Sequence, residues 1–331
     1  MLLRFFSGDR PSNAFWAGFL ALLLWIPSFL SDYTFAFEYP EKPMVLYGLI
    51  QSIFSHHPRI SKIFAFLFTL LLAYMIDRIN SRYILIQQRT LLPSFFFLMI
   101  TSFFQITHHF SAFLFASFFF LIAIELIFSV YKAEPDSYRF FDAGLLIGLA
   151  GIICLRFIYL IVFIWIVGII LRPFYWREYI FPLLGMFLPF AITGGIHYFV
   201  HGDLNLFIDV LKQNFLIHQL TFQGTYINLA FAGFMVFLIF IVSVYMLKVF
   251  QFRKIYIRNY YLALFWLFIV SLVIFVFLSG YGSRMIYVLA IPVSFILSNY
   301  FMNSRSRRAK NILFTLFLLI IFGGTVLKIL V

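Results

Sequence analysis

Long apolar runs separated by short polar or basic segments occupy almost the whole chain. A run of about 17–25 apolar residues is long enough to cross a bilayer as a helix. Arg156 divides the apolar run from 143 to 171, which is long for one ordinary span and short for two. Counting that run as two, the pattern predicts eleven transmembrane helices, at 13–31, 62–79, 91–107, 111–131, 143–155, 157–171, 179–199, 227–248, 260–279, 285–301 and 311–329.

Composition supports the same fold class. Hydrophobic residues make up 64% of the 331 residues and charged residues only 11%, against about 25% charged in a soluble domain. The sequence therefore predicts an all-α polytopic integral membrane protein, with one domain over residues 1–331. The 50 phenylalanines are expected to supply lipid-facing bulk. The net charge of +12 does not indicate nucleic-acid binding, because the basic residues form short clusters between apolar runs, where they set topology and contact headgroups.

The basic residues are distributed unevenly between the two sides of the predicted membrane. With the N-terminus inside, 17 of the 24 Lys and Arg residues fall in inner segments and 7 in outer ones. Short cytoplasmic loops carry such an excess of Lys and Arg. This bias predicts a cytoplasmic N-terminus and, after eleven spans, a C-terminus on the other side. The outer residues are Lys42, Arg59, Lys62, Arg156, Lys212, Arg284 and Lys328.

The first outer segment, 32–61, is long and opens with acidic residues. Asp32 follows the first predicted span directly, and Glu38 comes soon after it. From 44 to 55 apolar residues recur at helical spacing over too few positions to cross a membrane. This stretch is predicted to be an amphipathic helix lying along the outer surface. It is either a plain connector or a support that holds a carboxylate close to a lipid-borne substrate.

All seven histidines lie in or beside outer segments. Interfacial histidines can bond headgroups or backbone, bind a substrate phosphate or acceptor, or hold a metal, and these alternatives stay open. His197 and His201 are four residues apart, but no glutamate between them completes an HExxH pattern, so no metal is predicted. The single Cys154 gives no disulfide framework and no cysteine-rich metal site. The candidate substrate-binding histidines are His56, His57, His108, His109, His197 and His201.

Three charged residues lie at or near membrane depth. Arg156 and Arg284 are outer basic residues beside apolar runs, where a charge is costly unless it pairs or faces a polar cavity. An arginine can donate two hydrogen bonds to one phosphate, so both are candidate phosphate ligands. Glu125 lies within the predicted span 111–131. Two interpretations are open: Glu125 carries a proton in a transporter, or it bonds to a neighbouring helix.

Several segments resemble the GT-C superfamily of membrane glycosyltransferases, which use polyprenyl-phosphate sugars. The similar stretches are KPMVLYGLIQSIF, RINSRYILIQQRTLLPSFFFLMI, REYIFPLLGMFLPFAITGGIHYFVHGDL and GSRMIYVLAIPVSFIL, following one helix and an acidic outer loop. The order of apolar segments matches as well, while a clear Asp-x-Asp or Asp-Glu pair is missing and the loops are short for the family. The chain also resembles an uncharacterised group of multi-pass proteins of Bacteroidota.

The resemblance to GT-C enzymes implies a division of the chain and a set of roles. Residues 1–200 would form the GT-C-like core module, with 201–331 an outer loop and C-terminal helices. Asp32, or Glu38, would be the catalytic base, and Arg284 would hold the lipid phosphate. The implied partners are the bilayer and a polyprenyl-phosphate-linked sugar, with no cofactor. The implied location is the bacterial inner membrane, with the chemistry on the periplasmic side.

Two other functions remain open. A noncatalytic subunit of a membrane complex would keep a GT-C-like fold without the acid chemistry, and it would have membrane-protein partners. A transporter or flippase would need broken helices in paired halves and more intramembrane ionisable residues than Glu125. The sequence is compatible with an enzyme and with both of these alternatives.

Overall fold

A computed structural model describes residues 11–30, 57–86, 88–131, 138–172, 175–215, 226–249, 255–278, 285–304 and 306–330, and single residues between 3 and 54. Every regular element among them is a helix. In chain order these are α2 (Pro11–Leu30), α4 (Pro58–Tyr83), α5 (Leu92–Phe103), η1 (Gln105–Thr107), α6 (Ala112–Phe128), α7 (Tyr138–Ile153), η2 (Leu155–Leu160), α8 (Ile161–Leu171), α9 (Arg177–His201), α10 (Asn205–Phe215), α11 (Tyr226–Val249), α12 (Ile255–Leu278), α13 (Ile286–Asn303) and α14 (Arg307–Leu330).

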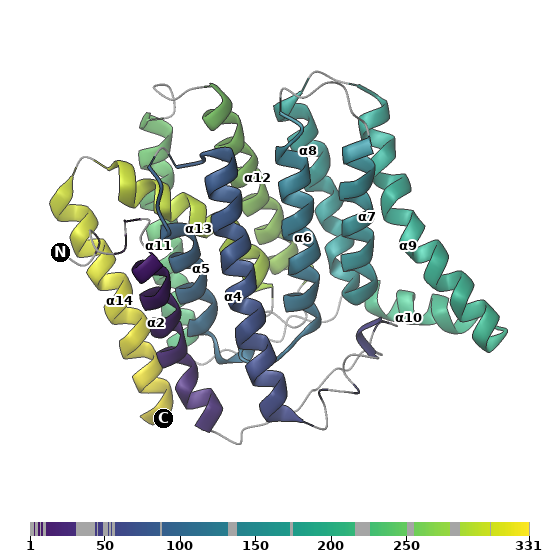
Figure 1. Ribbon diagram of the computed structural model, residues 1–331, viewed down its shortest axis with the longest axis horizontal. Coiled ribbons are helices and arrows are strands. Elements are labelled where there is room, and N and C mark those ends of the chain that lie inside the picture. The colour runs from purple at the N-terminus through teal and green to yellow at the C-terminus, as the bar shows by residue number, and fades with distance from the viewer. Residues whose placement is uncertain are drawn as a thin grey trace.

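Most of these helices run lengthwise through one bundle, in alternating directions (Figure 1). Among the described residues, seven helices are long and apolar enough to cross a membrane: α2, α4, α9, α11, α12, α13 and α14. The chain is thus a multi-pass helical membrane protein. Each of the eleven predicted segments coincides with helical residues, but α5, α6, α7 and the 155–171 stretch are shorter than 18 residues.

The two ends of the bundle are named here by what they carry. The histidine end, at the bottom of Figure 1, is where α5, α7 and α9 end and where α4, α6 and α13 begin. The described side chains of His57, His108, His109 and His197 all belong to elements at this end. The ion-pair end is the opposite one, where α4, α6 and α8 end.

Some predicted boundaries were wrong. The predicted spans 260–279 and 311–329 begin too late, because α12 begins at Ile255 and α14 at Arg307. A helix keeps its internal hydrogen bonds beyond the hydrocarbon layer, so polar residues extend it without ending it. The apolar run from 143 to 171 is divided just before Arg156. The helix α7 ends at Ile153, Cys154 is extended, and η2 leads into α8, so two elements share the run from 143 to 171.

The predicted surface helix at 44–55 is described at only a few positions. Residues 46–48, 52 and 54 are helical, and the Gly48 amide donates to the Met44 carbonyl as in an α-helix. Phe54 packs against Phe64 of α4 and against Phe110. The stretch is therefore helical at 46–48, 52 and 54, not at Met44, and it rests on the histidine end.

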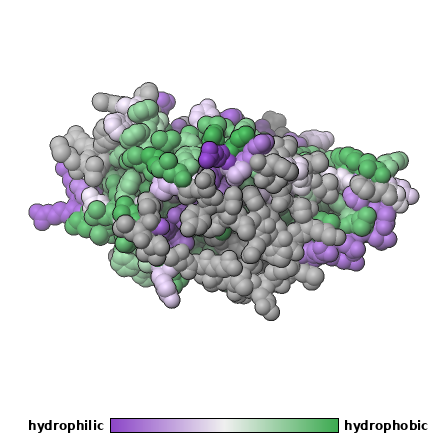
Figure 2. All heavy atoms as spheres, turned by 90° about the horizontal axis from the view of Figure 1, so that it is seen from below, coloured by the Kyte–Doolittle hydropathy of each residue, from purple (hydrophilic) through white to green (hydrophobic). Residues whose placement is uncertain are grey.

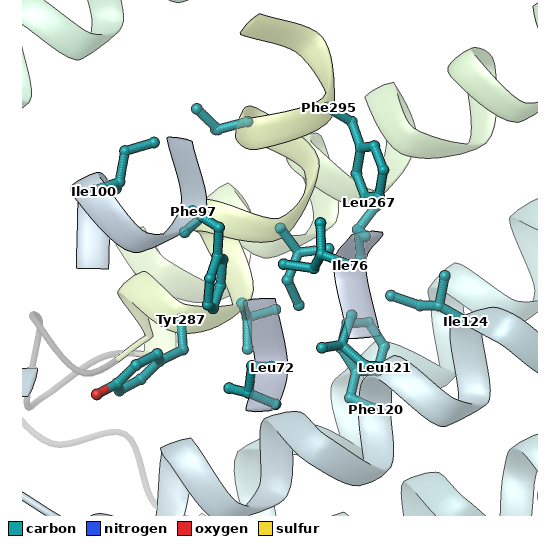
Figure 3. Packing of buried hydrophobic residues seen from close by; sticks show 14 of the residues in the cluster. Leu72, Ile76, Phe97, Ile100, Phe120, Leu121, Ile124, Leu267, Tyr287 and Phe295 are labelled. Carbon is teal, nitrogen blue, oxygen red and sulfur yellow. The ribbon is translucent and has the colours of Figure 1, made fainter. Parts of the chain in front are cut away.

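The core is built largely from aromatic rings. Ten phenylalanines are among the largest fully buried side chains, including Phe95, Phe96 and Phe97 on α5. Other phenylalanines, such as Phe187 and Phe240, are exposed and so available to lipid as expected, whereas these ten are buried. Lipid tails are as apolar as a side chain, so helices associate in a membrane through close packing, which large flat rings provide. Figure 3 shows residues of α4, α5, α6, α12 and α13 meeting in this core.

The helices α7 and α9 approach most closely. A Cβ added at Gly144 or Gly148 of α7 would collide with the Pro182 or Met186 carbonyl of α9, and one at Gly185 with the Phe141 carbonyl. Small residues at such spacing let two helix backbones touch inside a membrane. This contact fixes α9 against α7 and so determines where the segment after α9 leaves the bundle.

Candidate functional site

The connection between α5 and α6, residues 104–111, lies at the centre of the histidine end. Its side chains and carbonyls bond to helices from three other parts of the chain. Ser28 in the last turn of α2 bonds to His108 at 2.6 Å, and the Tyr287 hydroxyl of α13 donates to the Thr107 carbonyl at 2.6 Å. The Phe110 amide donates to Ser61 Oγ of α4 at 3.1 Å. The α5–α6 connection thus holds the end of α2 and the starts of α4 and α13 together.

The imidazole of His108 is buried and has two hydrogen-bond partners. Its Nε2 lies 2.9 Å from the Ser102 carbonyl, which can only accept, so Nε2 carries the proton and Nδ1 accepts from the Ser28 hydroxyl. The ring stacks on Trp25 with centroids 4.1 Å apart, and Trp25 Nε1 donates to Ser102 Oγ.

The same burial sets the charge of His108. Loss of hydration lowers the pKa of His108 to about 3, although the hydrogen bond to the Ser102 carbonyl acts in the opposite direction. The ring is therefore neutral near pH 7. A base this weak cannot take a proton from a hydroxyl efficiently. His108 consequently orders the histidine end and is poorly suited to general-base catalysis.

Two lysines at this end bond to backbone carbonyls at helix C-termini. Lys62 Nζ, on a side chain that is nearly inaccessible, donates to the Ser28 carbonyl in the last turn of α2 at 2.6 Å. Lys328 Nζ, near the end of α14, donates to the Phe103 carbonyl at the end of α5 at 2.7 Å and lies 3.6 Å from the Phe103 ring centroid. The last carbonyls of a helix have no partner within it, and a cation there also opposes the negative end of the helix dipole.

The candidate residues named from the sequence differ in their surroundings. Asp32, Glu38, His56 and Arg284 lie outside the described residues. Arg156 is buried in η2, with its guanidinium 5.9 Å from the ring centroid of Phe113 at the start of α6. This contact joins Arg156 to the same end as the α5–α6 connection.

The histidines likewise divide into separate groups. His57 is exposed just before α4, and His109 is buried beside His108. His197, in the last turns of α9, lies against Phe207 of α10. His201 ends α9, and its side chain is outside the described part of the chain. In that part, no cluster of three or more His, Cys, Asp or Glu side chains could hold a metal.

Sequence reasoning did not identify Trp25, Ser28, Lys62, Tyr287 or Lys328 as members of this site. Lys62 and Lys328 were recognisable as outer basic residues close to apolar runs. Their partners are backbone carbonyls, which every residue carries, so no sequence pattern could have identified them.

The ion-pair end has a different chemistry. Glu125 Oε1 of α6 accepts from Arg82 at 2.6 Å and lies 3.2 Å from Arg78, both on α4. Arg172 pairs with Glu178 at 3.0 Å, and both side chains are almost fully buried. Glu125 thus has structural partners on a neighbouring helix, which accounts for its position without a role in proton transport.

The fold and these two ends define a class of protein: an all-α multi-pass membrane protein with an aromatic-rich polar cluster at one end and ion pairs at the other. The model of a family described as "Family of unknown function (DUF6427)" matches residues 28–330. The chain belongs to this family. No curated protein and no solved structure matches it.

Proposed function

We propose that the chain is a membrane glycosyltransferase that moves a sugar from a polyprenyl-phosphate donor to an acceptor at the histidine end. One observation carries this proposal. Adjacent residues of the α5–α6 connection bond to the end of α2, through Ser28, and to the start of α13, through Tyr287. Asp32 follows α2 by two residues, and Arg284 precedes Met285 by one. Chain connectivity therefore favours a shared neighbourhood for the proposed base and the proposed phosphate ligand.

The proposed reaction is a direct displacement. The acceptor hydroxyl attacks the anomeric carbon of the sugar, and the bond from that carbon to the phosphate oxygen breaks. The hydroxyl proton passes to the carboxylate of Asp32, or of Glu38 as the alternative base. Polyprenyl phosphate leaves with the electron pair, and Arg284 and Arg156 stabilise its negative charge.

The histidines divide into two roles under this proposal. His108 is buried and neutral, so it orders the cluster. His57 is exposed beside the first outer segment and would contact the donor phosphate or the acceptor, together with His56. His109, His197 and His201 complete the candidate set, and His197 lies farther along the same end, against α10.

The proposal requires the histidine end to face the periplasm of a bacterial inner membrane. Eleven crossings with a cytoplasmic N-terminus give this orientation, and the shorter helices α5, α6, α7 and α8 would then cross together with their neighbours. The test uses Ser306→Cys, an exposed position between α13 and α14, in a chain whose only cysteine is replaced by Cys154→Ala. Thiol labelling should require permeabilised cells. Labelling in intact cells would show that position 306 faces the periplasm and would contradict the proposed orientation.

A second candidate function is a noncatalytic subunit of a membrane complex. It is favoured by the use of Lys62 and Lys328 as donors to helix-end carbonyls, which is a structural role. On this account the outer residues would bind a protein partner and no sugar would be transferred.

The two functions are separated by a transfer assay. The purified protein in nanodiscs is given polyprenyl-phosphate-linked sugars, and release of polyprenyl phosphate is measured. Asp32→Asn should abolish release, Arg284→Gln should reduce it strongly, and Lys212→Gln, an exposed outer lysine, should leave it unchanged. If Asp32→Asn is silent, Glu38→Gln tests the alternative base. If neither Asp32→Asn nor Glu38→Gln changes the release of polyprenyl phosphate, the transferase proposal is wrong. It is also wrong if the unaltered protein releases none from any donor.

A further inference from the structure

The short helix α10 has two different exposed sides. Leu204, just before it, and Ile208 and Phe215 form an apolar strip, with Leu204 42% and Phe215 56% exposed. Asn205, Asp209, Lys212 and Gln213 lie on an adjoining side and are exposed as well, and Leu206, 49% exposed, lies at the far edge of that side. At 100° per residue these two groups occupy neighbouring arcs of the helix surface.

A third side of α10 is attached to the bundle. Phe207 is buried, with its ring packed against Gly194 of α9 and near the ring of His197. At the end of the apolar strip, Phe215 also contacts Tyr159 of η2, with ring centroids 5.7 Å apart. The helix is thus held sideways against α9 and, at its end, against η2, while most of the apolar strip and the polar side are left open.

The connection from α9 to α10 is tight. Gly202 has a φ of 71°, a left-handed conformation that glycine adopts without strain, and it ends α9. The carboxylate of Asp203 then accepts from the Asn205 amide at 2.7 Å at the start of α10. Because α9 is long and apolar enough to cross a membrane, α10 begins within a few residues of the point where a spanning helix leaves the bilayer.

We propose that α10 lies in the interface of the bilayer at the histidine end, with its apolar strip in the acyl region and its polar side in water. In Figure 1, α10 turns back from the end of α9 and lies across the bundle. Figure 2 views that end, and hydrophobic and hydrophilic residues lie side by side on its right, where α9 ends. An in-plane amphipathic helix has this division of surfaces.

The partner is a neutral lipid surface. The polar side of α10 carries one acid, Asp209, and one base, Lys212, so it has no excess charge to attract anionic headgroups. Neighbouring exposed residues of α9, Tyr198, Phe199 and Val200, extend the apolar surface toward the membrane. Burial of apolar area, with no contribution from anionic lipid, would therefore hold α10 in place.

This position of α10 has a consequence for the site. Because α10 is attached to η2, it fixes η2, and with it Arg156, at the depth of the headgroups. The inference does not depend on the proposed transferase, since a noncatalytic protein could carry the same helix.

The test measures the surroundings of single spin labels by power saturation. Cysteines are placed one at a time at 204, 205, 208, 209 and 212 in the Cys154→Ala chain, reconstituted in phosphatidylcholine vesicles. Oxygen collects in lipid and a nickel chelate stays in water. Leu319 of α14, 68% exposed, is the lipid control, and Ser306 is the water control.

Labels at 204 and 208 should resemble the label at 319, with a several-fold higher ratio of oxygen to nickel accessibility than labels at 205, 209 and 212. Vesicles with added anionic lipid should give the same pattern. If 204 and 208 resemble 306, the helix stands in water and the inference is wrong. If both reagents are excluded from 204 and 208, a protein covers the strip, which also overturns it.

Discussion

Backbone groups at the two ends of α6 find their hydrogen-bond partners among different kinds of side chain. At the ion-pair end, the carbonyls of Glu125, Phe128, Ser129 and Val130 accept from side chains of four other segments. The donors are Tyr83 of α4, Tyr260 of α12, Arg139 of α7 and Arg172 after α8. At the histidine end, the connection into α6 is held by a neutral imidazole, hydroxyls and one amide.

The two ends show how a short helix is held in a membrane protein. The helix α6 has 17 residues, and the residues at its end, such as Phe128 and Val130, are buried in the bundle. Leaving a buried polar group without a hydrogen-bond partner lowers the free energy of unfolding by about 1–3 kcal/mol in mutational studies. At the ion-pair end, two arginines and two tyrosine hydroxyls cap the C-terminus of α6. At the histidine end, uncharged groups hold the connection into α6, and Lys62 and Lys328 bond to the ends of α2 and α5. The helices α2 and α13, which are held there, adjoin the outer segments with the candidate site residues.

The largest expected effect comes from the buried pair at the ion-pair end. Arg172→Met leaves the Glu178 carboxylate, only 3% exposed, without its partner and removes the donor to the Val130 carbonyl. The free energy of unfolding should fall by about 3–5 kcal/mol. Equilibrium unfolding in mixed micelles measures it. The double variant Arg172→Met/Glu178→Leu should recover most of the loss, and a single-variant loss below about 1 kcal/mol would contradict a buried ion pair.

A smaller effect is expected at the histidine end. His108→Leu removes the donor to the Ser102 carbonyl, while the Ser28 hydroxyl can turn to a carbonyl of its own helix. One buried carbonyl left without a donor should cost about 1–3 kcal/mol of unfolding free energy. His57→Leu, at an exposed position, is the matched control and should have little effect. Equal losses in both variants would mean that His108 does not order this end.

The response to pH should separate the two ends further. His108 has a pKa of about 3 in the folded protein and about 6.5 when unfolded, so below pH 6.5 the unfolded chain binds a proton that the folded chain excludes. The contribution of His108 to the free energy of unfolding is fully present above pH 6.5. Between pH 6.5 and pH 3 it falls by about 1.4 kcal/mol for each unit by which the pH is lowered. Unfolding of the unaltered chain and of His108→Leu should therefore converge as the pH falls from 7 to 5. Parallel pH profiles would show that His108 is not buried as a neutral ring.

The smallest effect is expected for the exposed partners of Glu125. The side chains of Arg78 and Arg82 are 54% and 55% exposed. Each can replace the other, so Arg82→Gln should lower the unfolding free energy by less than about 1 kcal/mol. A larger loss, comparable with that of Arg172→Met, would mean that Glu125 is sealed from solvent by these two arginines.

Much of the fold could be predicted because apolar runs bounded by charges are direct signals of membrane helices. The division of the apolar run 143–171 near Arg156, and the location of the described histidine side chains at one end, were both predicted from the sequence. The helix α10 was not predicted, because its apolar residues do not form a single stripe: some face the bundle and others lie on the exposed side. The caps of α6 and the roles of Lys62 and Lys328 depend on which carbonyls tertiary packing brings near, and sequence alone does not record that.

The central claim is that the histidine end receives a lipid-linked phosphate where α2 ends and α13 begins. The most direct measurement is a density map of the protein in nanodiscs with polyprenyl phosphate. The account predicts phosphate density beside the α5–α6 connection, contacted by Arg284 and facing the segment that carries Asp32. Phosphate density only at the ion-pair end, or a histidine end closed by packed side chains with Asp32 and Arg284 apart, would contradict it.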